Sequence, residues 1–286
     1  MSAFTSLVDL RWVDLDAQGH VNNALVADYL QEARVQWLQS GANVHLLGES
    51  TMVVSHQLEY LGPIGFSTDP VRIEVVVGPV GAARFQLAYT LTQGGRECAR
   101  GRSVLCLFDY RANRVRRMTG AERAWFAEQS IELAPMPSLG RWRVGEQAHE
   151  HDFHVRWSDV DAYGHVNNVR VFDYVAEARV RMNPDQDGPH RMAAAAEAGI
   201  TWMVARQDVD YLDQILLRPQ PYRVRTAIGR IGRTSVTTVA EVVDPLDGRV
   251  LVRTRTVVVS GDRSGRPVPL PELMLDAGRL WPAEEY

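Results

Sequence analysis

The chain has 286 residues, of which 45% are hydrophobic and 23% are charged. This composition is ordinary for a globular protein and lacks the hydrophobic depletion of disordered chains. A net charge of −4 and a pI near 6.1 give no general attraction for nucleic acid or for an anionic membrane surface. We therefore expect a folded protein, of about two domains at this length, with no nucleic-acid or membrane partner.

The cysteines and the N-terminal residues bear on location. Cys98 and Cys106 lie eight residues apart, without the Cys-x-x-Cys spacing of metal or redox motifs. The first residues lack the basic region of a signal peptide, and no apolar run approaches the roughly 20 residues that span a bilayer. These features predict a reduced, cytoplasmic protein.

An internal repeat organises the sequence. The segment Arg11-Trp-Val-Asp-Leu-Asp-Ala-Gln-Gly-His-Val-Asn-Asn23 recurs 145 residues later as Arg156-Trp-Ser-Asp-Val-Asp-Ala-Tyr-Gly-His-Val-Asn-Asn168. Further on, Glu59-Tyr-Leu61 corresponds to Asp210-Tyr-Leu212, at an offset of 151 residues. A match of this length is not a chance event and indicates a duplicated domain.

In the first copy we expect a short strand at 7–13 and then one long helix. Apolar residues with helical spacing predict the helix: Val26, Tyr29, Leu30, Ala33 and Trp37. Asn22 or Asn23 can cap its start, and Gly41 can end it. Segments rich in β-branched residues then predict strands at 51–61, 70–78, 83–92 and 97–108. One amphipathic helix and one antiparallel sheet bury their apolar faces best when the sheet curls around the helix.

Between the copies, residues 119–150 predict a short helix and a linker with Pro135 and Pro137. We place the domain boundary near 140, which gives domains 1–140, with the linker starting near 119, and 141–286. The second copy repeats the pattern, with a strand at 152–158. Its helix has an apolar stripe that ends at Met182 and a stop signal at Asn183-Pro184. Residues 222–226 and 250–259 are its clearest later strands.

The order of elements and the motif Asp-x-Asp-x-x-Gly-His-Val-Asn-Asn resemble hotdog thioesterases of the 4-hydroxybenzoyl-CoA thioesterase-like branch. The resemblance covers nearly the whole chain. It implies an α+β protein of two fused hotdog domains, each a long helix wrapped by a curved antiparallel sheet. Family members usually pair two hotdog subunits, and plant acyl-carrier-protein thioesterases place both in one chain. The resemblance thus implies an internal pseudo-dimer, either as a monomer or as a homodimer.

Thioester hydrolysis needs a carboxylate that attacks the carbonyl or activates water, and donors for the developing oxyanion. Asp16 and Asp161 precede the helices, and the family's catalytic carboxylate matches this second Asp of the motif. Helix N-terminal N–H groups can supply the donors, which the resemblance places near Asn23 and Asn168. The alternative for Asp16 and Asp161 is a turn or cap without chemistry. Asp14 and Asp159 are expected to order the turn.

Three further pairs in the motif have candidate roles. Gly19 and Gly164 let the backbone approach the substrate. His20 and His165 match a histidine that the plant enzymes use catalytically, although a structural cap is equally consistent with the residues. The plant motif has an Asn where this chain has Gln18 and Tyr163, which puts the plant mechanism in doubt and predicts two unequal sites.

Other residues are candidates outside the motif. His56 and Gln207 occupy corresponding positions on a strand and can reach a site from the sheet. Four residues around the Gly-x-x-Gly segments can bind coenzyme A phosphates, with solvated surface as the alternative: Arg84, Arg230, Arg233 and Ser235. The run His149-Glu-His-Asp-Phe-His154 superficially resembles a metal cluster, but no second ligand group has suitable spacing. We expect no metal and no cofactor.

The sequence therefore predicts an acyl-CoA or acyl-carrier-protein thioesterase. A hotdog hydratase is less consistent, because the motifs that such families use are missing from the sequence. A non-catalytic acyl-thioester binding or scaffolding module is the alternative from another class, because a fold alone does not determine function. The acyl group and the carrier cannot be deduced from the residues.

Overall fold

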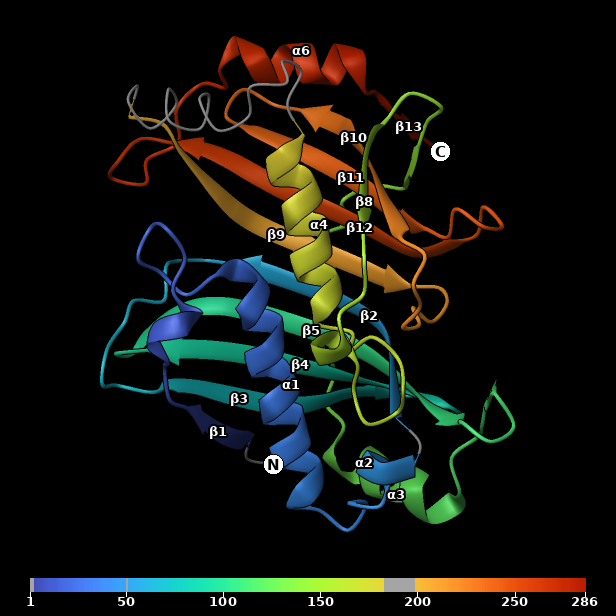
Figure 1. Cartoon of the computed structure of the whole chain (residues 1–286). Helices are drawn as coiled ribbons and strands as arrows, with labels where there is room; N and C mark the ends of the chain where they lie inside the picture. The colour runs from blue at the N-terminus through green and yellow to red at the C-terminus, as the bar shows by residue number, and fades with distance from the viewer. Residues whose placement is uncertain (1–2, 50, 183–198) are drawn as a thin grey trace. The chain divides into compact units, whose positions relative to one another are not determined.

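The computed structural model describes residues 3–49, 51–182 and 199–286, and the chain divides into two compact units, Met1–Pro137 and Ser138–Tyr286. Each unit places one long helix against one face of an antiparallel sheet (Figure 1). No helix in these described ranges is long and apolar enough to cross a membrane.

Unit 1 has a sheet with the strand order β1-β3-β4-β5-β2, and β6 pairs with β5. Its predicted strands after the helix agree closely with β2 to β5. The elements are β1 (Phe4–Val8), a 3-10 helix (Trp12–Asp14), α1 (Asn23–Gln39), α2 (Leu46–Glu49), β2 (Thr51–Tyr60), β3 (Val71–Val80), β4 (Arg84–Gln93), β5 (Arg96–Asp109), β6 (Arg114–Val115) and α3 (Gly120–Gln129).

Unit 2 repeats this plan with the order β9-β12-β11-β10-β8. A separate two-stranded sheet, β7 with β13, falls partly in the segment predicted to be a linker. The elements are β7 (Trp142–Val144), β8 (His149–Phe153), a 3-10 helix (Trp157–Asp159), α4 (Arg170–Arg181), β9 (Thr201–Tyr211), β10 (Tyr222–Ile231), β11 (Ser235–Val243), β12 (Val250–Gly261), α6 (Glu272–Leu280) and β13 (Ala283–Glu285). The predicted stop signal Asn183-Pro184 lies outside the described residues.

The strands predicted at 7–13 and 152–158 are wrong in their second halves, because the strands end at Val8 and Phe153 and the chain then forms 3-10 helices at Trp12–Asp14 and Trp157–Asp159. Asp14 explains the first departure, because its carboxylate accepts the backbone N–H of Arg11 at 3.0 Å. Asp159 accepts the backbone N–H of Arg156 at 2.8 Å in the same way. A side chain that satisfies a nearby backbone donor competes with strand pairing, so the chain turns here.

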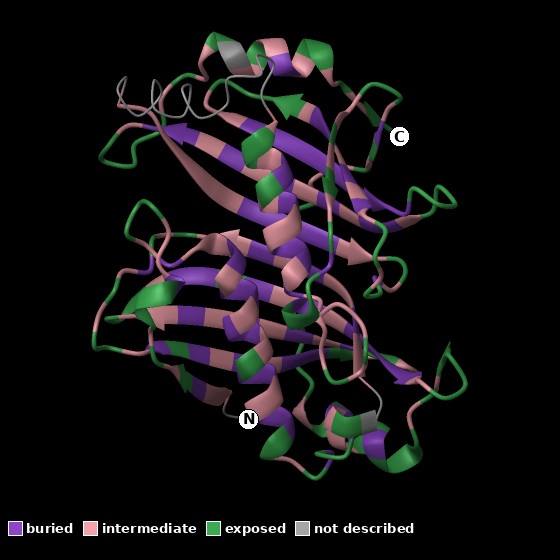
Figure 2. Ribbon diagram, viewed as in Figure 1, coloured by how far each residue is buried: buried purple, intermediate pink, exposed green. Residues whose placement is uncertain are grey.

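Helix α1 packs on the sheet through the predicted apolar stripe, of which every member is buried (Figure 2). Helix α1 lies close to the sheet at Gly101 of β5. A Cβ atom there would lie 2.6 Å from Leu30 Cδ1 and 3.1 Å from Leu58 Cδ2. Gly101 thus brings the helix and the sheet into contact, and the inner face of the sheet is the face that α1 covers.

Helix α3 closes one end of unit 1. Phe126 is fully buried and stacks on Phe85 with a ring-centroid distance of 4.2 Å. The helix begins with a reciprocal capping box, in which Thr119 Oγ1 accepts the N–H of Glu122 and the Glu122 carboxylate accepts the N–H of Thr119. Arg116 also donates two hydrogen bonds to Glu122, and these bonds lower the pKa of that carboxyl to about 2.

Candidate functional site

The repeated motif forms the same turn in both units. In unit 1 the N–H of Asp16 donates to the carbonyl of His20 at 2.8 Å, and the N–H of Gly19 donates to the carbonyl of Asp16 at 3.0 Å. Gly19 has φ +76° and no heavy atom within 4 Å of a Cβ position. Backbone conformation, not lack of space, therefore favours glycine at this position.

Unit 2 reproduces these contacts. The N–H of Asp161 donates to the carbonyl of His165 at 2.9 Å, and the N–H of Gly164 donates to the carbonyl of Asp161 at 3.0 Å. Gly164 has φ +80°. The turn geometry is thus a property of the repeated sequence.

The carboxylates of Asp16 and Asp161 each use one oxygen in this turn. Asp16 Oδ1 accepts the N–H of Gln18 at 2.8 Å and that of His20 at 3.3 Å. Asp161 Oδ1 accepts the N–H of Tyr163 at 2.9 Å. Within the described residues, the second oxygen of neither carboxylate receives a hydrogen bond. Both side chains are partly exposed, so the structural role of Oδ1 leaves Oδ2 available for chemistry.

Asp14 and Asp159 join the turn to the helix. Tyr29 of α1 donates its hydroxyl to Asp14 at 2.8 Å, and Tyr174 of α4 donates to Asp159 at 2.7 Å. Burial disfavours the charged form of Asp14, but hydrogen bonds from Arg11 and Tyr29 outweigh it and lower the pKa of this carboxyl. Burial and the adjacent carboxylate raise the pKa of both tyrosines. These carboxylates order the turn, as predicted.

The start of α1 follows directly from the turn. The N–H of Asn22 donates to the carbonyl of Asp14 at 2.8 Å, and Asn22 Oδ1 accepts the N–H of Ala24 at 3.0 Å. Asn22 is therefore the cap, and Asn23 is the first helical residue. Tyr60 from β2 donates its hydroxyl to the Asn23 carbonyl at 2.8 Å.

The start of α4 lies two residues later relative to the motif, because α4 begins at Arg170 and its cap, Val169, makes no side-chain hydrogen bond. Asn167 Oδ1 accepts the N–H of Val169 at 3.3 Å, and Tyr211 from β9 donates to the Asn168 carbonyl at 2.8 Å. In each unit a tyrosine thus fixes the motif asparagine against the strand that follows the helix.

A loop after β2 or β9 supports each motif from the other side. The N–H of Val21 donates to the carbonyl of Ile64, and that of Val166 donates to the carbonyl of Ile215, at 2.9 and 2.8 Å. In unit 1, the Gln93 amide holds this loop, because it bonds both the N–H and the carbonyl of Gly65 at 3.0 and 2.8 Å.

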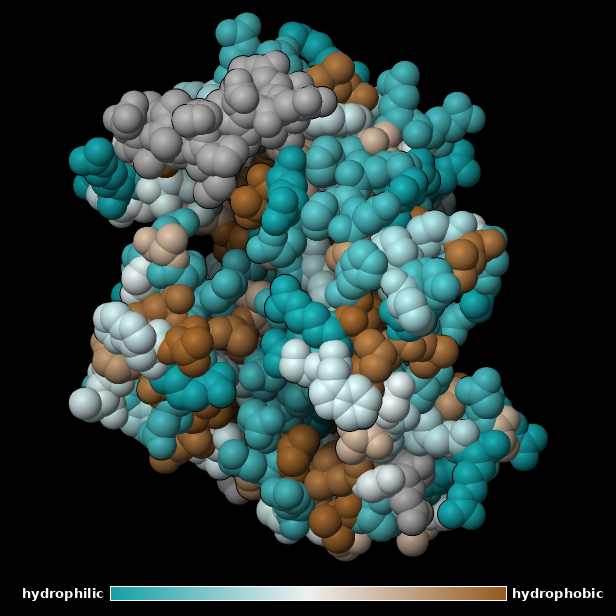
Figure 3. Space-filling model, viewed as in Figure 1, coloured by the Kyte–Doolittle hydropathy of each residue, from teal (hydrophilic) through white to brown (hydrophobic). Residues whose placement is uncertain are grey.

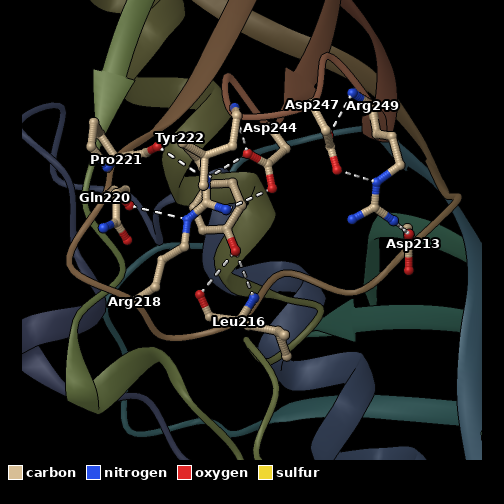
Figure 4. Close-up of polar contacts among 10 residues, drawn as sticks. Asp213, Leu216, Arg218, Gln220, Pro221, Tyr222, Asp244, Asp247 and Arg249 are labelled. Atoms are coloured by element: carbon tan, nitrogen blue, oxygen red, sulfur yellow. Dashed lines mark hydrogen bonds and ion pairs between the residues drawn. The ribbon is translucent and has the colours of Figure 1, made fainter.

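In unit 2, the Tyr222 hydroxyl bonds both the N–H and the carbonyl of Leu216, each at 3.1 Å (Figure 4). Arg218 lies over the Tyr222 ring and donates to both oxygens of Asp244 at 2.6 and 2.7 Å. The paired Arg218 lowers the pKa of Asp244. This network ties the motif-supporting loop to the β11–β12 connection.

The four phosphate-binding candidates lie far from the motif turn of their own unit. Arg84 begins β4, whereas Gln93, beside the motif-supporting loop, ends this ten-residue strand. At roughly 3.3 Å per residue, the separation is about 30 Å. Ser235 begins β11, while Arg230 and Arg233 flank the same β10–β11 turn and are exposed. Within one unit, these residues do not join the motif.

The candidate histidines occupy different surroundings. His20 and His165 lie in the motif turns, where they are partly exposed. His56 is buried on the inner face of β2, and its Nδ1 lies 2.8 Å from Ser103 Oγ. His149 packs edge-on against Trp281, and burial lowers its pKa. In the described ranges, no group of three or more metal-ligating side chains comes together.

Apolar side chains are exposed beside both motif turns. Trp12 and Trp157, at the start of the 3-10 helices, are 75% and 81% exposed. Trp12 contacts the half-exposed Phe66 edge to face, with ring centroids 5.3 Å apart. Hydrophobic residues also interrupt the hydrophilic surface on the face seen in Figure 3.

Sequence reasoning missed Gln93, Tyr222 and the Arg218–Asp244 pair. None of them belongs to the motif, and the residue types differ between the copies. Alignment of the repeats places Gln93 opposite Asp244. A polar residue at this position in both copies was the signal in the sequence that could have indicated a supporting role.

Comparison with protein families matches the thioesterase-like superfamily over residues 10–139 and again over 155–278. The chain belongs to this superfamily. The two matches and the described sheets confirm the predicted α+β fold with two hotdog domains. The 4-hydroxybenzoyl-CoA branch is not distinguished by this match. A search of curated proteins found no match.

Solved structures resemble nearly the whole chain. A protein described as an oleoyl thioesterase, from Lactobacillus plantarum, has a TM-score of 0.72 at 16% identity, with 94% of this chain and 98% of that chain covered. A 12:0-ACP thioesterase from Umbellularia californica has a TM-score of 0.67 at 17% identity, covering 90% and 97%. An acyl-ACP thioesterase from Bacteroides thetaiotaomicron has 0.66 at 12%, covering 89% and 96%. At these identities the likeness concerns the fold.

Proposed function

We propose that this protein hydrolyses acyl thioesters of coenzyme A or acyl carrier protein, giving a free acid and a thiol. Membership of the thioesterase-like superfamily supports the reaction class. The observation that carries the assignment is the repeated turn, in which Asp16 and Asp161 bind the backbone through Oδ1 while Oδ2 receives no hydrogen bond from the described residues. We also propose that the protein belongs to the 4-hydroxybenzoyl-CoA thioesterase-like branch of the superfamily.

The motif supplies each requirement of the reaction. Oδ2 of the motif Asp attacks the thioester carbonyl or removes a proton from the attacking water. Negative charge then develops on the carbonyl oxygen, and backbone N–H groups at the helix start near Asn23 or Asn168 stabilise it. The carbon–sulfur bond then breaks, and the sulfur leaves as a thiolate. With Asp as the base, the proton removed from water passes to the thiolate. With Asp as the nucleophile, water hydrolyses the acyl-aspartate anhydride that forms, which frees the acid and supplies the proton of the thiol. His20 and His165 are proposed to hydrogen-bond the thioester or the water.

Gly19 and Gly164 keep the turn open toward the substrate, because they have no side chain. The arginines and Ser235 of the Gly-x-x-Gly segments stay outside this catalytic group. Their proposed contact with coenzyme A phosphates is independent of the catalytic role of the motif, since within each unit they lie at the end of the sheet away from the motif turn. We further propose a cytoplasmic enzyme that needs no metal or cofactor and works as a monomer or a homodimer.

Replacement of Asp by Asn tests the role of the carboxylate cleanly. Asn retains Oδ1 as an acceptor, and Asn and Asp both favour this kind of turn. Asp16→Asn and Asp161→Asn should therefore keep the fold while removing the nucleophile or base. Free-thiol release is measured with short, long, branched and aromatic acyl-CoA and with acyl carrier protein, and the exposed Asp9→Asn serves as the charge-matched control.

We expect the double variant to lose hydrolysis while Asp9→Asn retains it. Wild-type turnover in a folded double variant would show that both carboxylates only order the turns. Tight acyl-thioester binding by the wild type without thiol release would instead identify the non-catalytic binding module.

A further inference from the structure

A cavity lies in unit 1, on the face of the sheet opposite α1. Side chains alternate along β5, so Arg102 points to the face away from the one that Gly101 presents to the helix. Residues 130 and 131 pair with the edge of β3, and residues 132–136 then cross this outer face, where Leu133 lies over Gly78. The N–H of Ile131 donates to the carbonyl of Val77 at 2.9 Å, and Ser130 Oγ donates to the carbonyl of Gly78 at 2.7 Å. Between this segment and the strands lies a cavity of about 330 Å³.

The polar lining of the cavity has a single charged member. Ser55 and Gln57 come from β2, Gln86 comes from β4, and Arg102 comes from β5. Arg102 donates to the carbonyl of Ala134. Among the described residues, no carboxylate pairs with Arg102. Burial lowers the pKa of this guanidinium, which agrees with a cation that no acid compensates.

In unit 2, the arginine at the corresponding position is paired with a carboxylate of the protein. Gln57 is the strand partner of Arg102, and Asp208 is the strand partner of Arg255. Arg255 donates to Asp210 at 2.6 Å, while Asp208 binds Arg206 at 2.8 Å. Every cation of this group in unit 2 therefore has a carboxylate partner.

The corresponding residues of unit 1 do not include this ion pair. By the 151-residue offset, Asp208 corresponds to Gln57, and Arg206 corresponds to Ser55. Unit 1 thus keeps the arginine but replaces the neighbouring ion pair with an amide and a hydroxyl. A partly buried cation among neutral donors is suited to an anion from outside the protein.

The rest of the lining restricts the kind of anion. Pro79, Leu133 and Met136 supply apolar walls beside the polar group. A planar guanidinium matches a carboxylate in a two-pronged hydrogen bond, and the apolar walls match a short hydrocarbon chain. We propose that this cavity binds a small monocarboxylate, with its acid group on Arg102 and its hydrocarbon part against Leu133 and Met136. This site lies apart from the proposed catalytic turns and does not depend on them.

Calorimetric titration of the full chain with butyrate tests the proposal. Butyramide has the same shape without the charge, and inorganic phosphate carries charge without the hydrocarbon part. Arg102→Gln removes the cation. Gln57→Glu places a carboxylate opposite Arg102, as Asp208 stands opposite Arg255, so it supplies an internal counter-ion by an arrangement that already folds in unit 2. Arg100→Gln, on the same strand but paired with Glu97, is the control.

We expect saturable binding of butyrate that weakens by about tenfold or more in Arg102→Gln and in Gln57→Glu, because one loses the charged donor and the other occupies it. Arg100→Gln and the Asp16→Asn, Asp161→Asn double variant should bind butyrate like the wild type. Three results would each overturn the proposal: cavity variants that bind butyrate as tightly as the wild type does, wild-type protein that binds butyramide or phosphate as tightly as butyrate, or no butyrate binding at millimolar concentrations. Loss of binding in the double variant would instead assign the acid to the catalytic turns.

Discussion

The two units build the same motif turn but support it with different side chains. In unit 1 the Gln93 amide bonds the N–H and the carbonyl of Gly65, whereas in unit 2 the Tyr222 hydroxyl bonds those of Leu216. Asp244, which corresponds to Gln93, holds Arg218 instead. The carbonyls of Ile64 and Ile215 nonetheless receive the same bond from the motif. The duplicated chain has therefore kept the backbone geometry around the motif, not the residues that provide it.

The inner faces of the two sheets differ more strongly. In unit 1, His56 and Ser103 bond each other across β2 and β5. The strand partners at this level in unit 2 are Gln207 and Thr256. Thr226, Thr254 and Thr256 are buried, and their hydroxyls have no hydrogen-bond partner in the described part of the chain. Unit 2 thus has a more polar interior beneath its helix.

The largest expected effect concerns the two catalytic turns. Gln18 can orient water through its amide, but Tyr163 at the same position has no amide to do so. We therefore expect Asp16→Asn to lower kcat by about 10²–10⁴-fold, the usual contribution of a general base or acid, while Asp161→Asn leaves most turnover. Free-thiol release with each single variant decides this. Equal losses in both would show that the tyrosine does not impair the second site.

A second difference is the glycine under α1. Gly101→Thr introduces at this position the residue type that Thr254 provides in unit 2, and we expect a loss of about 3 kcal/mol, because the new Cβ meets the fully buried Leu30. Urea unfolding measures the change. Gly65→Ala is the control, since no heavy atom lies within 4 Å of its Cβ position. A cost no greater than that of Gly65→Ala would mean that the helix moves freely on its sheet.

The Arg218–Asp244 pair should stabilise unit 2 by about 2 kcal/mol at neutral pH, the scale of a charged hydrogen bond, and Asp244→Asn should remove it. Because Arg218 lowers the pKa of Asp244 in the folded state, this contribution is present above the pKa of the unfolded chain and disappears as the pH falls through the folded pKa. Urea unfolding from neutral to strongly acidic pH measures the difference between variant and wild type.

For that comparison, Asp247→Asn is the exposed control and should leave the unfolding midpoint unchanged. A difference between Asp244→Asn and the wild type that persists undiminished in strong acid would rule out the charged pair as its source.

The smallest expected effect has opposite signs in the two units. Thr256→Val replaces a buried hydroxyl that has no hydrogen-bond partner among the described residues by a methyl group, and should stabilise the protein by about 1 kcal/mol. Ser103→Ala removes one hydrogen-bond partner of the buried His56 and should destabilise the protein by a similar amount. The two free energies of unfolding are compared directly. Destabilisation by Thr256→Val would reveal a bound partner for that hydroxyl.

The sequence was sufficient for the repeat, the long helices and the strands β2 to β5, because apolar periodicity and turn residues specify these elements locally. It was insufficient at residues 9–13, where the Asp14 carboxylate overrides the strand pattern through the backbone of Arg11. The motif predicted the turn, but the supporting Gln93 and Tyr222 act over long sequence separations and with different chemistry in each copy. Only the folded sheet brings them to the loops.

The exposed tryptophans beside the motif turns also give the protein intrinsic fluorescence reporters at these turns. An indole in water emits at longer wavelength than a buried one and is open to collisional quenchers. Trp12 and Trp157 therefore place one solvent-exposed emitter beside each motif turn. Replacement of either residue by Phe would leave a single reporter at one of the two turns, so that occupancy of each turn can be followed separately by light.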